Sequence, residues 1–174
     1  MLIGLDPLLS GEALAVLRDM GHGDSLAIVD SNFPATFLGP PSVRMDCDIV
    51  QAGRAILSVF PLDAFVDAPL ARMEVIGRPS EVTDAQAEFV AMVEEVSGPG
   101  WTVGSYERFA FYEAARDCVA VFATLDRRPY ANFILTKGVI GPDGAVVRGG
   151  VGTRRTPGAG PRAAARPVRQ TGRR

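Results

Sequence analysis

At 174 residues, with 47% of them hydrophobic, the chain has the length of one domain and enough apolar side chains for a sizeable core. No apolar run approaches the roughly 20 residues of a membrane span, and no basic region precedes the apolar N-terminal residues. We therefore expect neither a membrane helix nor a signal peptide. The two cysteines, Cys47 and Cys118, lie in apolar segments without zinc-ligand spacing, which favours buried thiols in a reducing cytoplasm.

Charge divides the chain into a body and a tail. Residues 141–174 carry eight arginines and a single acid, Asp143, whereas residues 1–140 carry 10 basic and 19 acidic side chains. The tail is rich in Arg, Gly, Pro and Ala, so we expect a disordered extension after one domain of residues 1–140. A basic tail could bind nucleic acid, but this one has no aromatic side chains for base stacking, which favours an extension without a specific partner.

Apolar periodicity and capping residues predict the elements of the N-terminal half. Ser10 can cap a helix that runs to about Met20, with Gly21 ending it. Residues 25–29 form a short apolar run typical of a buried strand, and the proline-containing segment 31–43 is expected to be a loop. Asp46 can cap a second helix that ends near Phe60.

The C-terminal half continues the alternation. Residues 70–76 predict a strand, and Thr83 opens a capping-box pattern for a helix to Val96. A short strand at 101–103 precedes a helix that Ser105 can cap and that runs through Asp117. Strands follow at 118–124 and 132–136, close enough in sequence to form an antiparallel edge pair. This order predicts an α/β layered single domain with a mostly parallel sheet flanked by helices.

His22 is the only histidine, and with Asp30 it flanks the first predicted strand. Imidazole is the side chain best suited to move protons near neutral pH. If the turn before the strand folds back, Asp30 could accept a hydrogen bond from one ring nitrogen and leave the other for proton transfer. A solvated loop histidine and an aspartate that satisfies its own turn remain the alternatives.

Two further pairs have spacings that place their side chains together. Arg108 and Tyr112 are four residues apart on a predicted helix, and Tyr130 and Asn132 are two apart at the start of a strand. A guanidinium beside a phenol can bind sugar hydroxyls, and a phenol and a carboxamide can share one pocket wall. The alternatives are an amphipathic helix with Arg108 paired to a surface acid, and residues that merely end a turn.

Several common nucleotide and hydrolase motifs are absent from the sequence. The chain has no G-x-G-x-x-G after a strand, no Walker loop, no G-x-S-x-G elbow and no H-E-x-x-H. Dinucleotide, nucleoside-triphosphate and zinc-hydrolase functions therefore lack support, and we expect neither a cofactor nor a metal.

An ordered set of short stretches resembles the D-ribose pyranase and L-fucose mutarotase family, and its fucose branch in particular. The stretches are Met20 to Asp24, Asp30 with Asn32 to Ala35, Gly39-Pro40, Arg44 with Asp46, Arg108 to Glu113, Tyr130 to Leu135 and Lys137 to Val139. They cover residues 1 to about 140. Ser31-Asn32 stands where some members have Ala-His, and the tail from residue 141 has no counterpart in the family.

The resemblance implies an α/β fold in a ring-based homo-decamer with sites at subunit contacts, and anomer interconversion of a fucose-like monosaccharide without a cofactor. It places the family's site histidine at His22, its aspartate at Asp30, its arginine at Arg108 and its Tyr/Asn pair at Tyr130 and Asn132.

Together with the residue patterns, the resemblance predicts three catalytic residues, His22, Asp30 and Tyr130. It also predicts three substrate-binding residues, Arg108, Tyr112 and Asn132. The alternative is a non-catalytic sugar-binding or transport-accessory protein of the same fold.

Overall fold

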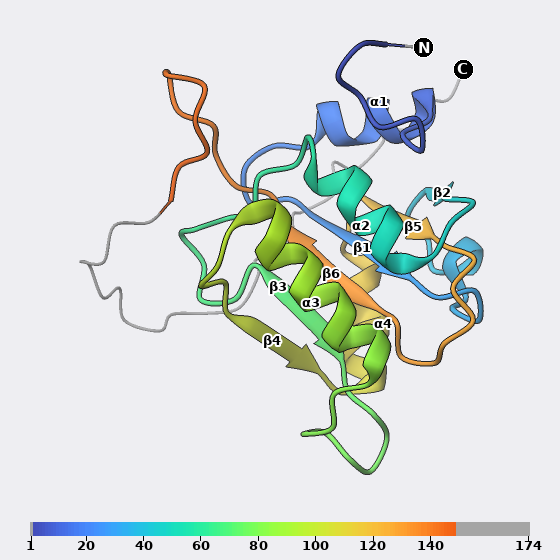
Figure 1. The fold of residues 1–174 in the computed structure, drawn as a ribbon. Helices are drawn as coiled ribbons and strands as arrows, with labels where there is room; N and C mark the ends of the chain where they lie inside the picture. The colour runs from blue at the N-terminus through green and yellow to red at the C-terminus, as the bar shows by residue number, and fades with distance from the viewer. Residues whose placement is uncertain (1, 149–174) are drawn as a thin grey trace, which may run out of the picture.

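A six-stranded sheet in the order β2-β5-β1-β6-β3-β4 forms the centre of the protein in the computed structural model, which describes residues 2–148 (Figure 1). β6 is antiparallel to both of its neighbours, β1 and β3, and the other pairings are parallel. The prediction of a mostly parallel sheet is confirmed. The strands are β1 (Ser25–Val29), β2 (Ser42–Arg44), β3 (Leu70–Met73), β4 (Val103–Tyr106), β5 (Ala120–Ala123) and β6 (Phe133–Thr136).

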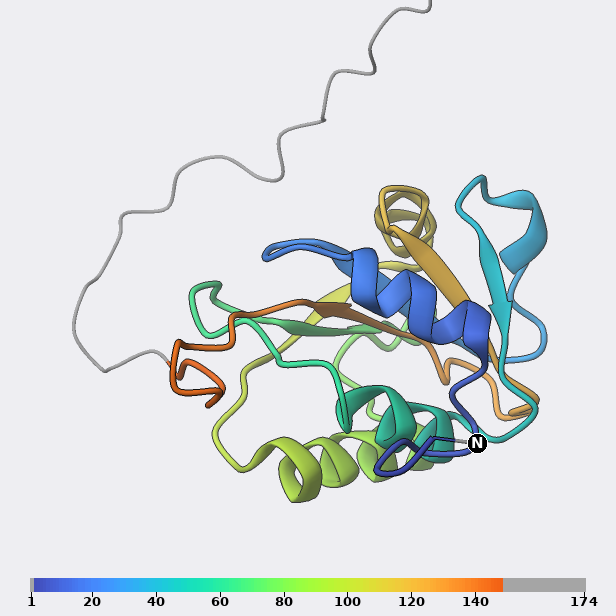
Figure 2. The ribbon, with the colours of Figure 1, turned by 90° about the horizontal axis from the view of Figure 1, so that it is seen from above.

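Helices cover both faces of this sheet. The helical elements are α1 (Gly11–Asp19), the 3-10 turn η1 (Ala35–Phe37), α2 (Ile49–Leu57), α3 (Asp84–Ser97) and α4 (Arg108–Arg116). The larger apolar cluster packs α1, α2 and α3 on one face, and the smaller packs α4 on the other. Figure 2 shows α2 and α3 opposite α4 across the sheet. In β1, Leu26 and Ile28 pack in the larger cluster and Ala27 and Val29 in the smaller. Both faces of this strand are therefore buried, which explains its unbroken apolar run.

Capping side chains set the helix starts, and two of the predicted caps are wrong. Ser10 and Thr83 cap α1 and α3 as predicted. α2 is capped by Asp48 rather than Asp46, because the Asp48 carboxylate accepts the Gln51 N–H at 2.8 Å. α4 is capped by Glu107, and the predicted cap Ser105 lies in β4.

The sheet differs from the sequence prediction at its edges and at its centre. The predicted antiparallel edge pair does not form, because β6 lies between β1 and β3 and β5 pairs with β1 and β2. The edge strand β2 was not predicted, since it is three residues long and follows two prolines. β3 ends at Met73, earlier than predicted, and β4 begins at Val103, later than predicted.

Residues 141–148, which the charge pattern assigns to the tail, fold back on the body. Ile140 and Val146 form an antiparallel bridge, and Gly144 adopts a φ of 79° in the turn between them. The Arg148 guanidinium then lies 5.1 Å from the centre of the Trp101 ring. Figure 1 shows this hairpin projecting beside the sheet. The rest of the predicted tail, residues 149–174, lies outside the described residues.

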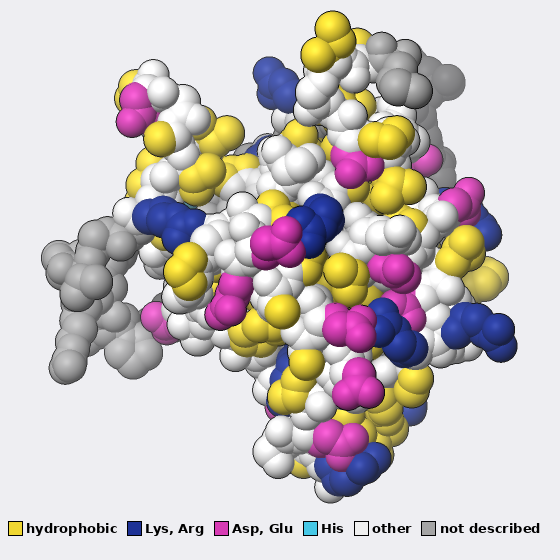
Figure 3. All heavy atoms as spheres, in the orientation of Figure 1, with side chains coloured by type: hydrophobic (Ala, Val, Ile, Leu, Met, Phe, Trp, Pro, Cys, Tyr) yellow, Lys and Arg dark blue, Asp and Glu magenta, His cyan; other side chains and the backbone are white. Residues whose placement is uncertain are grey.

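The helical layer of α2 and α3 combines close packing with a charged outer surface. A Cβ at Gly53 would lie 2.5 Å from Cε2 of the fully buried Phe89 ring, so a larger residue there would require the α2–α3 packing to shift. Arg54 makes two hydrogen bonds to Glu95 across the same helix pair. Figure 3 shows acidic and basic side chains interspersed over this face.

The two cysteines are free and buried, as predicted, and burial raises the pKa of Cys47 to about 11 and that of Cys118 to about 12. Both thiols therefore stay protonated near neutral pH. No helix within residues 2–148 is long and apolar enough to span a membrane.

Candidate functional site

A pocket of about 220 Å³ gathers five of the six predicted site residues. It lies beyond the carboxyl end of β1, between α4 and the turn that leads into β6. Small ligands commonly bind at the carboxyl ends of strands in open α/β sheets. The lining residues are Asp30, Asn32, Phe33, Met73, Arg108, Tyr112, Pro129, Tyr130 and Asn132.

Asp30 and Asn132 form a buried polar pair in this pocket. The Asn132 amide donates to Asp30 Oδ2 at 2.8 Å, and the Asp30 backbone N–H donates to Asn132 Oδ1 at 2.9 Å. The Asn32 N–H also donates to Asp30 Oδ1 at 2.8 Å, so Asp30 satisfies its own turn as well as facing the pocket. Burial raises the pKa of Asp30, against the opposing effect of the hydrogen bonds from Asn32 and Asn132, and the nearby Asp126 carboxylate adds to the increase.

Tyr130 enters the pocket from a strained backbone. Its φ is 63°, in the left-handed region that side-chain-bearing residues seldom occupy. The fully buried Gln86 amide donates to the carbonyl oxygens of Tyr130 at 2.9 Å and of Met73 at 2.7 Å. Gln86 therefore ties α3 to two of the residues that line the pocket. Its sequence signal, the capping box with Thr83, did not reveal this second role.

The Arg108 guanidinium has no acidic partner among residues 2–148. It lies 4.8 Å from the centre of the Phe109 ring and 5.9 Å from that of Tyr112, and its Nε is buried without a hydrogen-bond partner. Pairing of Arg108 with a surface acid, the alternative left open by the sequence, is not observed in the part of the chain that is described. The guanidinium is free to donate to oxygen atoms of a ligand.

His22 lies outside this pocket, on the amino side of β1. Its ring is half exposed, and Nε2 is 3.2 Å from both carboxylate oxygens of Asp63. The predicted contact between His22 and Asp30 is not made within one chain. The five residues of β1 lie between His22 and Asp30 and span about 16 Å at the rise of a strand. The sequence offered no signal for Asp63, which is 41 positions from His22.

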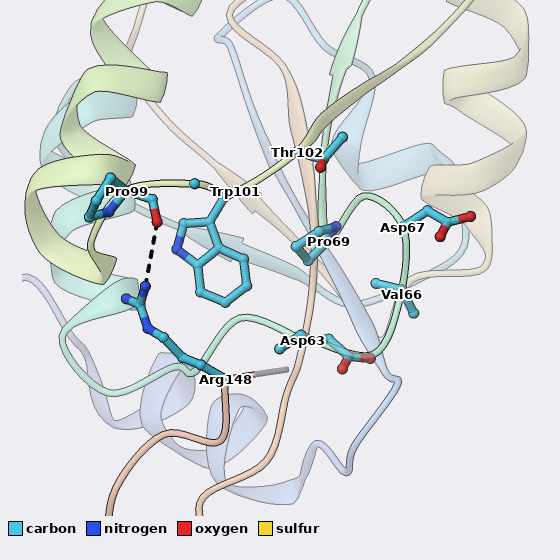
Figure 4. A pocket seen from close by; sticks show the side chains of 10 residues that line it. Asp63, Val66, Asp67, Pro69, Pro99, Trp101, Thr102 and Arg148 are labelled. Atoms are coloured by element: carbon cyan, nitrogen blue, oxygen red, sulfur yellow. Dashed lines mark hydrogen bonds between the residues drawn. The ribbon is translucent and has the colours of Figure 1, made fainter. Parts of the chain in front are cut away.

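A second cavity, of about 300 Å³, adjoins Asp63 and shares no lining residue with the pocket at Asp30. In Figure 4 the Trp101 ring and Arg148 stand on one side of it, and the Asp63 carboxylate turns away from Trp101. Arg148 donates to the Pro99 carbonyl oxygen at 3.5 Å. No group of three His, Cys, Asp or Glu side chains that could hold a metal ion occurs in the described part of the chain.

The pocket beside this mixed sheet is lined by one carboxylate, two carboxamides, one guanidinium and two phenols, and these groups can form hydrogen bonds with a small, hydroxyl-bearing ligand. The fold and this pocket together define a single-domain α/β protein with a polar ligand site. The chain belongs to the RbsD / FucU transport protein family, whose family model matches residues 3–140.

Named relatives in this family share most of the chain. It is 37% identical over 142 residues to an L-fucose mutarotase of Actinobacillus pleuropneumoniae, covering 80% of this chain and 97% of that protein. It is 38% identical over 144 residues to the fucose mutarotase of Homo sapiens, covering 79% and 93% respectively. The crystal structure of the Streptococcus pneumoniae fucose mutarotase in complex with L-fucose superposes with a TM-score of 0.74 at 30% identity, over 80% of this chain and 99% of that one.

Proposed function

We propose that the protein is an isomerase that interconverts the anomers of L-fucose, or of a closely related sugar, by acid–base opening and closure of the sugar ring. The observation that carries this proposal is the pocket that brings Asp30, Arg108, Tyr112, Tyr130 and Asn132 together. The relatives also support it, because the chain is 37–38% identical to an L-fucose mutarotase and a fucose mutarotase over nearly their whole length.

The chemistry requires two proton transfers and no cofactor. The anomeric hydroxyl loses a proton as C1 becomes a carbonyl carbon, and the ring oxygen gains a proton as its bond to C1 breaks. Rotation and reclosure give the other anomer. Because positioned acids and bases contribute about 10²–10⁴-fold each, one or two of them suffice for a reaction that is already measurable without a catalyst.

Asp30 and Tyr130 can supply proton transfer within the pocket. The raised pKa of Asp30 brings its carboxyl group closer to the range in which it can both donate and accept protons. Arg108, Tyr112 and Asn132 bind and orient the sugar hydroxyls, with the unpaired guanidinium of Arg108 as the strongest donor.

His22 joins this site from a second copy of the chain. Since β1 separates His22 from Asp30 within one chain, a homo-oligomer is the arrangement that can bring the imidazole to the pocket; we propose the ring-based decamer that the resemblance implies. Large apolar side chains are exposed at both places: Phe65 beside His22 and Phe109 beside Arg108 are 62% and 64% exposed. Exposed aromatic groups of this kind are typical of surfaces that pack against a partner.

The role that we propose belongs to carbohydrate metabolism in the cytoplasm. Two free, buried thiols fit a reducing compartment, and the reaction uses a free monosaccharide as its substrate.

Saturation-transfer NMR between the two anomers tests the activity. L-Fucose, D-ribose, galactose and rhamnose are compared with and without protein, and we expect the largest acceleration for L-fucose. His22→Ala should abolish the acceleration and leave the fold intact, because His22 is a half-exposed loop residue. Sugar binding without accelerated exchange of any of the four sugars would refute the proposal in favour of a non-catalytic sugar-binding protein.

Mixing two inactive variants tests the shared site. His22→Ala and Asp30→Asn protein are unfolded together and refolded in equal amounts. If His22 and Asp30 of one site come from different copies, about one quarter of the sites regain both residues. No recovery of exchange in the mixture would refute a site that is shared between two copies of the chain.

A further inference from the structure

We propose that Asp126 is a positioning residue of the sugar pocket: held by Arg128 and by the first turn of α2, it fixes the turns that carry Asp30 and Tyr130 and keeps a second negative charge beside Asp30. This inference rests on the proposed function. It assigns a role to a residue that does not itself line the pocket.

Asp126 is a buried carboxylate that is well supplied with hydrogen-bond donors. Its side chain is 3% exposed. Arg128 donates to Oδ1 from Nε at 3.0 Å and to Oδ2 from Nη2 at 2.7 Å, and the Arg128 backbone N–H donates to Oδ1 at 2.9 Å. The Ile49 N–H donates to Oδ2 at 3.3 Å from the start of α2, where the helix dipole favours a negative charge. Two parallel bonds from one arginine fix the orientation of the carboxylate as well as its position.

The same residue connects the two turns that face the pocket. The Asp126 carbonyl oxygen accepts the Ser31 N–H at 2.8 Å, and Ser31 follows Asp30 directly. On the other side, the bonds between the Asp126 carboxylate and Arg128 shape the turn that leads to Tyr130, whose φ is 63°. The position of Asp30 relative to Tyr130 therefore depends on Asp126.

Helix α3 holds this second turn at two places. Arg128 Nη1 donates to the Glu88 carboxylate, and the Gln86 amide donates to the Tyr130 carbonyl oxygen at 2.9 Å. Arg128 is thus shared between Glu88 on its exposed side and Asp126 on its buried side. The Asp126–Arg128 pair is consequently joined to the helical layer rather than carried by a free loop.

Asp30 and Asp126 are two buried carboxyl groups in opposite environments. Burial would raise the pKa of Asp126, but the hydrogen bonds from Arg128 and Ile49 outweigh burial and leave this pKa below its usual value. Burial raises the pKa of Asp30, and repulsion by the Asp126 carboxylate adds to the increase. Environments that separate the pKa values of two carboxyl groups let one stay ionised while the other exchanges protons. Asp126 is the group that stays ionised.

Other ionisable groups face Asp30, and a change at Asp126 leaves them in place. The ones that line the two cavities containing Asp30 are Arg108 and Tyr112 of α4, Arg44 of β2, and Tyr130. Arg44 forms an ion pair with Asp46 in which both side chains are 73% exposed, so solvent screens this pair. His22 is a further ionisable group that the proposed oligomer brings to the pocket. A substitution at Asp126 therefore alters the surroundings of Asp30 without removing a group that contacts sugar.

Asp126→Asn tests the charge. The amide keeps the size of the side chain and an oxygen acceptor, and Arg128 retains Glu88, so the fold should survive. Carboxyl ¹³C NMR of the full chain, with the Asp30 signal assigned by its loss in Asp30→Asn, measures the pKa of Asp30 directly. We expect this pKa to fall, because the repulsion is lost. The part of the pH profile of anomer exchange that depends on Asp30 should move to lower pH.

Arg128→Lys tests the geometry. Lysine keeps the positive charge but replaces the planar two-pronged donor with a single ammonium group. The Asp30-dependent part of the pH profile should therefore stay where it is. The highest exchange rate should fall about 10-fold or more, since a displacement of about 1 Å at a reacting group can cost about 10²-fold.

Glu95→Gln is the matched control, because it removes a carboxylate that makes two hydrogen bonds to an arginine, Arg54, on the exposed surface of α2 and α3. It should change neither the pKa of Asp30 nor the exchange profile. The inference is overturned if the pKa of Asp30 in Asp126→Asn equals or exceeds that of the wild type. It is also overturned if Arg128→Lys exchanges anomers at the wild-type rate, a result that decides the matter even if Asp126→Asn does not fold. Failure of wild-type protein to accelerate exchange of any sugar would instead refute the proposed function, and the carboxyl titration would still decide whether Asp126 acts on Asp30.

Discussion

The substitution Gln86→Glu measures how much one buried amide contributes to the candidate pocket. Ionised glutamate retains an acceptor for the Thr83 N–H but has no donor for the carbonyl oxygens of Met73 and Tyr130. Each carbonyl that loses its buried partner costs about 1–3 kcal/mol. We expect the two together to lower the free energy of unfolding by about 2–6 kcal/mol. A loss of about 3 kcal/mol corresponds to a melting temperature lower by roughly 6–12 °C in a domain of this size.

Gln51→Glu provides the control, since Gln51 occupies the same capping-box position on the exposed side of α2. Urea denaturation of both variants gives the difference in stability. Gln86→Glu should also slow anomer exchange at temperatures where it is fully folded, because the Tyr130 backbone loses the hydrogen bond that holds it at positive φ. Equal unfolding free energies for the two variants would show that these hydrogen bonds do not stabilise the pocket.

Three further predictions concern the sugar, pH and the C-terminal hairpin. Arg108→Ala should weaken sugar binding about 10- to 150-fold, the loss of one charge-assisted hydrogen bond, as a calorimetric titration will show. Burial raises the pKa of Asp30, so the stability that its protonated form contributes is complete below pH 3.8 and is lost as the pH rises through the folded-state pKa. Asp30→Asn should therefore become more stable relative to wild type as the pH rises from below 3.8 to above that pKa. Urea unfolding that shows the opposite trend would contradict the raised pKa. Deleting residues 149–174 should change neither the oligomeric state, measured by sedimentation, nor the rate of anomer exchange. Deleting residues 141–174 should lower the free energy of unfolding by about 1–2 kcal/mol, measured by thermal unfolding, because it removes the contact of Arg148 with Trp101 and the hydrogen bonds of the hairpin.

The features that could be predicted from the sequence are those that depend on near neighbours. Ser10 and Thr83 cap their helices through contacts three residues away, and the β1 run is apolar because both of its faces are buried. Competing local signals explain the errors, since Asp48 and Glu107 stand within two residues of the predicted caps Asp46 and Ser105.

The features that were missed depend on distant parts of the chain. The pocket residues were found as separate local pairs, but nothing in the spacing of His22 or Gln86 identifies Asp63 or Tyr130 as their partners. The position of β6 in the sheet could not be predicted from the adjacent sequence either. An apolar strand that closely follows another can pair with it as a hairpin or can pair with strands far away in the sequence, and the apolar pattern is the same in both cases. The sequence already places His22 and Asp30 at opposite ends of β1, and the structure shows that the turn before β1 does not fold back toward Asp30, because His22 contacts Asp63 instead.

The central position of β6 has a consequence for how the protein folds. β6 is the last strand of the sheet in sequence, and it alone joins the β2-β5-β1 half to the β3-β4 half. Its hydrogen bonds reach across long stretches of chain, and Asn132, just before it, meets Asp30 from 102 positions away. Such pairings require long loops to close, with a loss of chain entropy, before their hydrogen bonds can form, and this slows folding. During synthesis the two halves of the sheet cannot be joined until β6 is available. The polar pair of the pocket therefore forms among the final steps, and a chain that ends before Asn132 cannot form it.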